Sequence, residues 1–308
     1  MPENVIVIGG GPAGLSAALY AAREEFKPLV IAGSIAGGQL LMTTVVDNYP
    51  GYPDGIMGPE LVEKMRKQAE RFGARIINED VIDVDFTKRP FKVITASQTY
   101  EAKTVIIATG ASPRLLGIKS EMKFMGTGVS TCATCDGAFF KGKDVIVVGG
   151  GDTAMEDASF LTRFCTSVTI IHRKDAFKAS KIMQDHVKNN PKIKIIWDSV
   201  VDEILGTEQP EKVTGVRIKN LKNGKTAELV AQGVFIAIGY VPSTKFLQGK
   251  LELDEHGYIV TRDDVMTDIE GIFVAGDNAD KFYRQASTAS AEGVKAALRV
   301  REYLQNNP

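Results

Sequence analysis

The stretch that decides the fold is VIVIGGGPAGLSAA, residues 5–18. Its apolar, β-branched start predicts a buried strand, and its alanine-rich end predicts a helix after a glycine turn. Gly9, Gly11 and Gly14 form the pattern G-x-G-x-x-G. In such βαβ units the first glycine permits a tight turn, the second lets the backbone approach a pyrophosphate, and the third lets helix and strand pack closely. The free N–H groups at the start of the helix then attract phosphate.

The same pattern occurs a second time in VIVVGGGDTAMEDA, residues 145–158. Gly149, Gly151 and Ala154 take the three positions of the motif. Each copy is followed by another apolar stretch, at 28–32 and 167–173, which completes a βαβ unit. One glycine-rich turn is a weak signal, but two in matching context predict two dinucleotide sites.

Two further stretches resemble each other and predict how the units are connected. Residues 104–114, TVIIATGASPR, and 233–242, GVFIAIGYVP, each read as a buried strand followed by glycine and proline. We interpret them as the two crossings between domains. The sequence therefore predicts an α/β fold with two Rossmann-like, three-layer ββα nucleotide-binding domains. The first is discontinuous, 1–113 and 242–308, and the second, 114–241, is inserted into it.

Other segments predict ordinary secondary structure. Residues 59–73 place Leu61, Met65, Ala69 and Phe72 on one helical face. Asn223 and Gly224 predict a hairpin turn, and residues 287–304 predict a C-terminal helix.

The composition limits the function classes. The chain has 308 residues, 44% of them hydrophobic and 24% charged, and its formal net charge is −1. Nothing in this balance predicts attraction to nucleic acid or to a membrane surface. Only three cysteines are present, which fits a reducing, cytoplasmic compartment better than a disulfide-stapled secreted fold. The N-terminal stretch reads as strand, turn and helix rather than as a signal peptide.

The basic stretch HRKDAFK, residues 172–178, predicts which nucleotide the second unit binds. An NAD site has an acid near the end of the second strand, whereas an NADP site has basic residues there. His172, Arg173, Lys174 and Lys178 cluster at this point without an acid at the tip. We therefore expect NADPH in the inserted domain, with a solvated basic surface as the alternative.

The first unit also lacks an acid at the end of its second strand, where VIAGS leads into GSIAGGQL. A different acid, Asp277, follows the predicted strand in GIFVAGDN, residues 271–278. A carboxylate at a strand end suits a polyol hydroxyl, such as the ribitol of FAD. An aspartate after a strand can instead cap a helix. Together with the first βαβ unit, Asp277 favours FAD.

The segment TCATCDG, residues 131–137, holds Cys132 and Cys135 two residues apart. It fits half of a zinc site, a structural disulfide or a redox-active pair. Too few further cysteines and histidines remain in suitable spacing to complete a zinc site, and we expect no metal. A disulfide across so short a loop stabilises little. A dithiol that accepts electrons is favoured, with Asp136 as a candidate acid or as a turn cap. Cys165 reads as a buried apolar residue.

Taken together, these motifs resemble the low-molecular-weight thioredoxin reductases, class II pyridine nucleotide-disulfide oxidoreductases, over essentially the whole chain. The matching pieces are GGGPAGLSAALYAAR, GGQL, DNYPG, IIATGASPR, CATCDG, GGGDTA, HRKDAFK, AGDN and YRQAS. The resemblance implies a thioredoxin-disulfide reductase of the EC 1.8.1.9 type. Such an enzyme is a homodimeric flavoprotein that uses tightly bound FAD and NADPH and has thioredoxin as its partner, without nucleic acid or membrane.

The resemblance also implies site residues. Cys135 would face the flavin, Cys132 would attack the protein disulfide, and Asp136 would act as the acid. The FAD residues would be Gly9, Gly11, Pro12, Gly14, Ser34, Gly38, Gln39, Asn48, Thr109, Gly110, Asp277, Arg284, Gln285 and Ala286. The NADPH residues would be Gly149, Gly151, Asp152, Thr153, Ala154, Arg173, Lys174 and Lys178. The family also rotates its inserted domain, for which the linkers Ser112–Pro113 and Val241–Pro242 would be suitable hinges.

Two departures from the family pattern leave alternatives open. Lys174 and Lys178 stand where relatives usually have arginines, which softens the expected preference for NADPH over NADH. Thr127 replaces a basic partner contact found in some relatives, while Phe139 and Phe140 could dock a partner or fill the core. The alternatives are a reductase with another donor, such as ferredoxin, a deazaflavin or NADH, a reductase with another acceptor, or a non-catalytic redox sensor.

Overall fold

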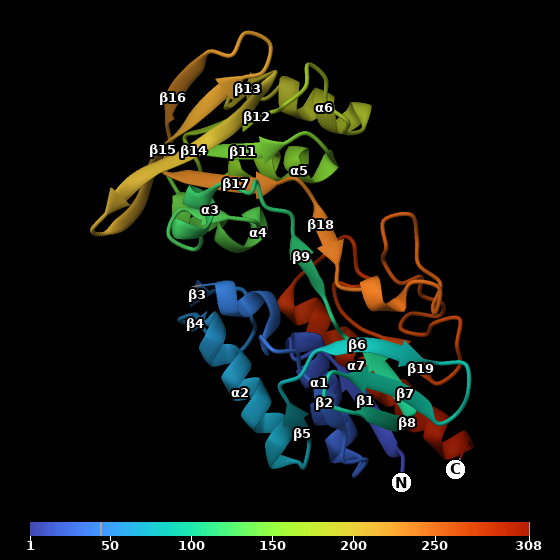
Figure 1. The fold of residues 1–308 in the computed structure, drawn as a ribbon. Helices are drawn as coiled ribbons and strands as arrows, with labels where there is room; N and C mark the ends of the chain where they lie inside the picture. The colour runs from blue at the N-terminus through green and yellow to red at the C-terminus, as the bar shows by residue number, and fades with distance from the viewer. Residues whose placement is uncertain (44, 308) are drawn as a thin grey trace. The chain divides into compact units, whose positions relative to one another are not determined.

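A computed structural model describes residues 1–43 and 45–307 and divides the chain into two compact units (Figure 1). Unit 1 comprises Met1–Ser112 and Val241–Pro308, and unit 2 comprises Pro113–Tyr240. The chain crosses between them along β9 (Ala111–Pro113) and β18 (Tyr240–Pro242), which pair as a two-stranded sheet.

Unit 1 is built on a seven-stranded sheet in which the strands nearest the glycine turn are parallel. Its order is β5 (Arg75–Ile77), β2 (Leu29–Ile31), β1 (Glu3–Ile8), β8 (Thr99–Ile107), β7 (Phe91–Thr95) and β6 (Val81–Asp85), with β19 (Ile272–Val274) also paired to β8. The last two strands of this order are antiparallel. A separate short hairpin joins β3 (Val45–Val46) and β4 (Ile56–Met57).

Both faces of this sheet are buried, which explains the continuous apolar runs of its parallel strands. Val5 and Val7 of β1 pack into one core with α1 (Pro12–Arg23) and α7 (Ala286–Asn306). Ile6 and Ile8 pack into a second core on the opposite face. The remaining helices of unit 1 are α2 (Gly58–Arg71) and the 3-10 turns η1 (Gly38–Met42) and η3 (Lys245–Leu247). The helix at 59–73 is confirmed, but Phe72 is exposed, with Arg23 and Arg71 over its ring.

Unit 2 has a five-stranded parallel sheet between helices and a second sheet. Its order is β10 (Val129–Ser130), β17 (Gly233–Ala237), β11 (Asp144–Gly149), β12 (Ser167–Ile171) and β13 (Ile193–Ile196). The helices of this unit are α3 (Lys119–Lys123), α4 (Ala133–Asp136), η2 (Gly137–Phe140), α5 (Asp152–Leu161) and α6 (Lys181–Lys188). The second sheet is an antiparallel meander of β14 (Ser199–Glu208), β15 (Glu211–Asn220) and β16 (Thr226–Val230).

The two faces of β11 show how these layers are held together. Val145 and Val147 pack against α5 and α6, whereas Ile146 and Val148 pack against β14 and β15. This is the expected ββα layering, and the α/β class with two Rossmann-like units is confirmed. The hairpin at Asn223–Gly224 and the C-terminal helix are also confirmed.

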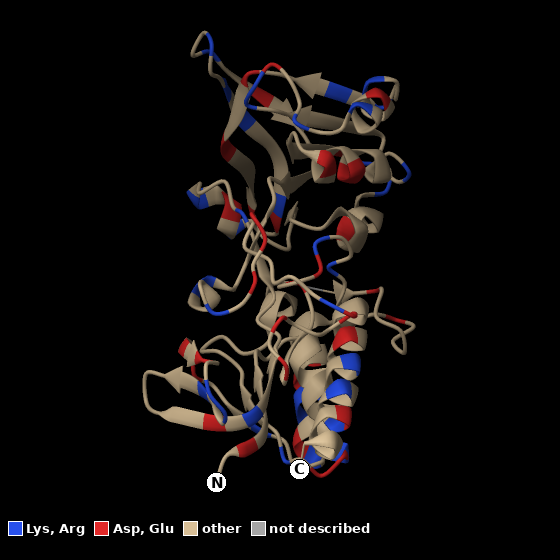
Figure 2. Cartoon of the chain, turned by 90° about the vertical axis from the view of Figure 1, so that its right-hand side faces the viewer, with Lys and Arg blue, Asp and Glu red and all other residues tan. Residues whose placement is uncertain are grey.

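The charged residues of both signs are interspersed over the described parts of both units (Figure 2). The chain holds 37 Lys and Arg against 38 Asp and Glu. No described helix is both long and apolar enough to span a bilayer.

Candidate active site

The three motif glycines of the turn between β1 and α1 differ in how much space surrounds their Cα atoms. Gly9 has φ of +120°, and a Cβ there would lie 2.1 Å from the carbonyl oxygen of Ala108. A Cβ on Gly14 would lie 2.0 Å from the carbonyl oxygen of Gly9. A Cβ on Gly11 would meet no described atom within 4 Å. Gly9 and Gly14 are therefore required by packing, whereas the space around the Gly11 Cα is open.

Several other predicted FAD residues lie around this turn, at the carboxyl ends of the parallel strands. Pro12 is the first residue of α1, whose N-terminal N–H groups receive no side-chain cap from Gly11. Gly38 comes close enough that a Cβ on it would be 3.6 Å from Gly11 Cα, and Gln39 follows it in η1. Thr109 and Gly110 continue from β8, next to Gly9. Ligands of open α/β sheets bind at this edge.

Asp277 follows β19 in a largely buried turn. Burial raises the pKa of its carboxyl to about 7, with repulsion from Asp280 adding to the effect and Arg284 opposing it. No described residue hydrogen-bonds to this carboxyl. The alternative that Asp277 caps a helix is wrong, because the next helix, α7, begins at Ala286 with Gln285 as its cap.

Asn278, the neighbour of Asp277, is a polar residue that our sequence reasoning missed. It is fully buried, and its Nδ2 donates to the carbonyl oxygen of Ile107 at 3.0 Å. Its Oδ1 is buried without a hydrogen-bond partner among the described residues. A buried amide oxygen without a partner, next to the half-buried Asp277 carboxyl at the same strand end, indicates a place for a hydroxyl-bearing ligand.

Two of the predicted FAD residues, Asn48 and Gln285, are hydrogen-bonded to each other although they lie far apart in the sequence. Asn48 Nδ2 donates to Gln285 Oε1 at 3.1 Å. Gln285 also forms a capping box with Thr288 at the start of α7, where Ala286 is the first residue. Arg284 has φ of +48°, and its backbone N–H donates to Asp280 Oδ2 at 3.2 Å.

At the carboxyl end of β2, an acidic side chain from another part of the sequence contacts the backbone. The backbone N–H of Ser34 donates to Asp80 Oδ1 at 2.8 Å. Asp80 follows β5, which pairs with β2, so the two lie together only in the folded sheet. No local pattern in the sequence signals this contact, because 46 residues separate its partners.

The second glycine turn, in unit 2, repeats the arrangement of the first. A Cβ on Gly149 would lie 2.3 Å from the carbonyl oxygen of Ala237 and 2.7 Å from Ala154 Cβ. A Cβ on Gly151 would meet no described atom within 4 Å. Asp152 and Thr153 open α5 immediately afterwards. Gly11 and Gly151 are thus equivalent open positions.

The basic stretch after β12 contains one residue that does not belong to the predicted cluster. His172 is buried, and burial lowers the pKa of its imidazole. Its ring packs on Phe177 and Trp197, with centroids 5.5 and 6.1 Å away. His172 therefore does not belong to the basic cluster with which the sequence analysis grouped it. Arg173, Lys174 and Lys178 are exposed.

Cys132 and Cys135 form a disulfide with an S–S distance of 2.06 Å and a Cα–Cα distance of 5.3 Å. Cys132 is the N-cap of α4, and the backbone N–H of Cys135 points at Cys132 Sγ at 3.2 Å. The Thr134 hydroxyl lies 3.4 Å from the same sulfur. The Cys132 sulfur therefore lies among groups that stabilise negative charge on it.

Asp136 ends α4 directly after this pair. Burial raises the pKa of its carboxyl, and the Ser130 hydroxyl partly offsets the effect. The alternative that Asp136 caps the next turn is wrong, because its side chain makes no capping hydrogen bond to η2.

Three further residues that the sequence analysis singled out, Cys165, Phe139 and Phe140, differ in their burial. Cys165 is buried in the core, and burial raises the pKa of its thiol to about 11. Phe140 is a core residue packed edge-on against Phe235. Phe139 is exposed, so it alone remains a docking candidate.

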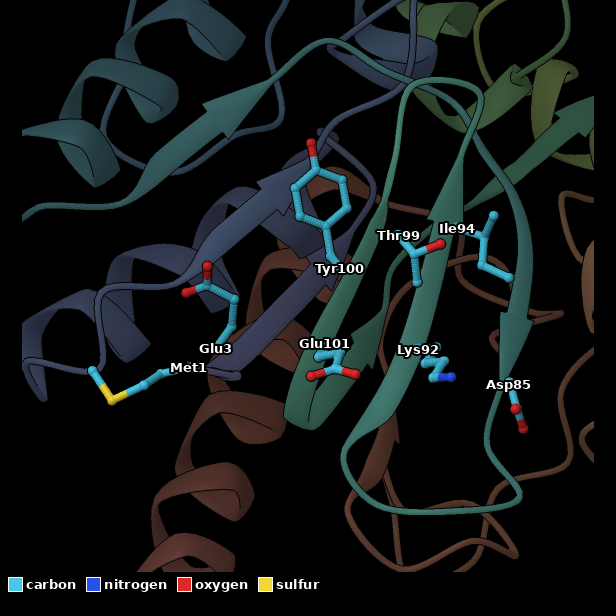
Figure 3. Close-up of a pocket in the computed structure, with 8 residues that line it drawn as sticks. All are labelled: Met1, Glu3, Asp85, Lys92, Ile94, Thr99, Tyr100 and Glu101. Carbon is cyan, nitrogen blue, oxygen red and sulfur yellow. The ribbon is translucent and has the colours of Figure 1, made fainter.

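One hollow on the described residues lies away from these groups (Figure 3). Its volume is about 720 Å³. It is lined by Met1, Glu3, Asp85, Lys92, Ile94, Thr99, Tyr100 and Glu101. Glu3 begins β1 and Thr99 begins β8, so the hollow lies toward the amino ends of these strands, opposite the edge where dinucleotides bind. A smaller hollow of about 490 Å³ is lined by residues 47–53, including Asn48.

Two glycine turns of dinucleotide type and a disulfide-forming cysteine pair are the features expected of a pyridine nucleotide-disulfide oxidoreductase. The family model described as pyridine nucleotide-disulphide oxidoreductase matches residues 3–293. The chain belongs to this family.

Full-length relatives carry a more specific name. The chain is 51% identical to a thioredoxin reductase of Rickettsia typhi over 98% of both sequences. It is 51% identical to a thioredoxin reductase of Streptomyces clavuligerus over 98% of this chain and 94% of that one. The crystal structure of thioredoxin reductase from Streptococcus pyogenes matches with a TM-score of 0.94 and 44% identity, over 99% of this chain and 98% of that one. The resemblance identified from the motifs is confirmed, and the Cys132–Cys135 pair fits the redox-active dithiol of such enzymes.

Proposed function

We propose that this chain is an NADPH-dependent flavoprotein thioredoxin-disulfide reductase, in which electrons pass from NADPH through FAD to the Cys132–Cys135 pair and on to thioredoxin. The observation that carries the proposal is the combination of a CxxC disulfide with two glycine turns whose second positions, Gly11 and Gly151, are open. The names of the full-length relatives support the same activity.

Unit 1 fits FAD. The open space at Gly11 and the uncapped N–H groups of α1 suit a pyrophosphate. The Asp277 carboxyl and the unpartnered Oδ1 of Asn278 suit ribitol hydroxyls. Bound there, FAD would supply two-electron transfer between the nicotinamide and the disulfide. The other FAD residues predicted from the sequence stay part of this proposal.

Unit 2 fits NADPH. Gly149, Gly151 and Ala154 shape the pyrophosphate turn, and Asp152 and Thr153 begin the helix behind it. Arg173, Lys174 and Lys178 are exposed beside this turn and suit the 2′-phosphate.

In the exchange with thioredoxin, the reduced pair acts through two sulfur atoms. The Cys132 thiolate attacks the thioredoxin disulfide, forms a mixed disulfide with one sulfur and releases the other as a thiolate. The Cys135 thiolate then attacks Cys132 Sγ, restores the Cys132–Cys135 disulfide and frees the thioredoxin dithiol. Asp136, whose raised pKa keeps it protonated over a wider pH range, donates a proton to a departing thiolate.

The homodimer, the cytoplasmic location and the rotation of the inserted unit stay predictions. Pro113 and Pro242, in the two crossing strands, are the hinge candidates.

The proposal is tested by measuring NADPH consumption in the presence of a disulfide dye, with and without oxidised thioredoxin. We expect a yellow protein that turns over thioredoxin many times and reduces the dye efficiently only when thioredoxin is present. Turnover with ferredoxin or NADH but not with NADPH would show that the electron donor is not NADPH. A single stoichiometric reduction without turnover would favour a redox sensor.

A further inference from the structure

Residues 173–179 form the loop that carries the basic residues of unit 2, here called the basic loop. Aromatic side chains attach this loop to the rest of unit 2. Phe177 is buried, and its ring centroid lies 4.3 Å from that of Trp197. His172 packs against both rings, and its Nε2 lies 3.1 Å from the carbonyl oxygen of Ala176. The loop thus has a packed base, while Arg173, Lys174 and Lys178 stay exposed.

The same loop is also attached to the glycine turn. The backbone N–H groups of Lys178 and Ala179 donate to the carbonyl oxygen of Gly150, at 2.8 and 3.3 Å. A Cβ on Gly150 would lie 2.2 Å from the His172 ring, so the turn rests directly on the aromatic base. The pyrophosphate turn and the basic loop are therefore held at a fixed spacing.

A third attachment is made by a side chain. Both the backbone N–H and the hydroxyl of Ser180 donate to Asp152 Oδ1, each at 2.8 Å. These bonds lower the pKa of the Asp152 carboxyl. Asp152 is the first residue of α5, next to the open position at Gly151, and Ser180, directly after the basic loop, is the N-cap of α6. One carboxylate oxygen thus joins the start of the pyrophosphate helix to the end of the basic loop.

We propose that the Asp152–Ser180 contact is a positioning clip that sets the discrimination between NADPH and NADH, because it fixes the distance from the pyrophosphate turn to Arg173, Lys174 and Lys178. This inference rests on the proposed function of unit 2 as the NADPH site. Asp152 acts here through its carboxylate on the loop, a role separate from any contact of its backbone with the nucleotide.

The residue types of the loop explain why a clip matters. An arginine holds a phosphate through a planar fork with two bonds, whereas a lysine acts as a point charge on a flexible stem. With two lysines and one arginine, the side chains themselves fix little geometry. The position of the backbone that carries them must then determine how well they reach the 2′-phosphate.

The test compares the dissociation constants of NADP⁺ and NAD⁺ for the full-length, FAD-loaded protein by calorimetry. For Ser180→Ala we expect the NADP⁺ preference to fall about tenfold, through weaker NADP⁺ binding and unchanged NAD⁺ binding, and for Asp152→Ala we expect the preference to fall by a similar factor. Asp152→Asn keeps an oxygen that can accept both bonds from Ser180, and its preference should stay within about twofold of the wild type. Removing the negative charge of Asp152 would by itself strengthen binding of a phosphate. For Asp152→Ala, electrostatics therefore predicts tighter NADP⁺ binding, whereas loss of the positioning contact predicts weaker NADP⁺ binding.

Asp185→Asn is the matched control. It removes the same charge from α6, where Asp185 pairs with Lys181, and leaves the clip intact. An unchanged NADP⁺ preference in both alanine variants would overturn the inference, as would an equal weakening of both nucleotides. A wild-type protein that binds neither nucleotide would instead overturn the proposed function, and the inference with it.

Discussion

At the scale of single residues, the structure separates side chains that serve the fold from those that are left for a ligand. His172, Phe140 and Cys165 belong to the core although each is chemically suited to a site. Asp277 is the reverse case, because its carboxyl is largely buried without a described hydrogen-bond donor. A charged group in such a position lowers stability unless a ligand satisfies it.

Asp277→Asn should therefore stabilise the protein without FAD and weaken FAD binding. The pKa of about 7 lies above the ordinary value of 3.8, so the folded state binds the proton more tightly than the unfolded state. Stability then falls as pH rises from about 4 to 7. At pH 8 the variant should gain roughly 1–3 kcal/mol in the free energy of unfolding, and near pH 4 almost nothing.

Urea unfolding of the apoprotein at both pH values, together with a fluorescence titration of FAD, provides the measurement. FAD affinity should fall about tenfold or more, because an ionised hydrogen-bond acceptor is lost. Asp280→Asn removes a neighbouring acid and should lower the pKa of Asp277. An apoprotein stability that does not change with pH differently in wild type and Asp277→Asn would contradict this account.

At the scale of elements, the two strand–turn–helix segments are built alike. In both, the first and third motif positions are filled by packing and the second is open. Gly11 and Gly151 have φ of −82° and −96°, which alanine adopts without strain. The second position can therefore be changed without damage to the fold.

Gly11→Ala and Gly151→Ala should leave the free energy of unfolding of the apoprotein unchanged or raise it by about 0.4–1 kcal/mol. Gly11→Ala should reduce FAD affinity at least about tenfold and leave NADP⁺ binding intact, since a methyl group would keep the backbone from a pyrophosphate. Gly151→Ala should reduce NADP⁺ affinity at least about tenfold and leave FAD binding intact. Nucleotide titrations of the two variants check this reciprocal pattern.

Gly14→Ala is the contrasting variant in the same turn. Its Cβ would lie 2.0 Å from the carbonyl oxygen of Gly9, so α1 must move, and we expect a loss of about 3 kcal/mol or more in stability. If Gly11→Ala proved as destabilising as Gly14→Ala, or bound FAD normally, the open position would not be a nucleotide site.

At the scale of the whole molecule, sequence patterns were sufficient to predict those features that depend on a few neighbouring residues. The repeated glycine motif, the apolar runs on both faces of β1 and β11, and the CxxC pair all act over a few residues, and they predicted the two units and the chemistry. Contacts across strands were missed: Asp80 meets Ser34, and Ser180 meets Asp152, only once parallel strands bring their loops to one edge. Burial also cannot be predicted from a local pattern, which is why His172 was grouped with the basic residues of the second unit.

The central claim is that electrons leave the protein through Cys132. It is tested most directly by mixing anaerobic, FAD-loaded protein with NADPH and then oxidised thioredoxin, while following the flavin absorbance and the thioredoxin thiols, for wild type and Cys132→Ser. The wild type should bleach and then reduce many equivalents of thioredoxin, whereas Cys132→Ser should bleach as readily and reduce none. Continued thioredoxin turnover by Cys132→Ser, or a wild-type flavin that NADPH fails to bleach, would contradict the account.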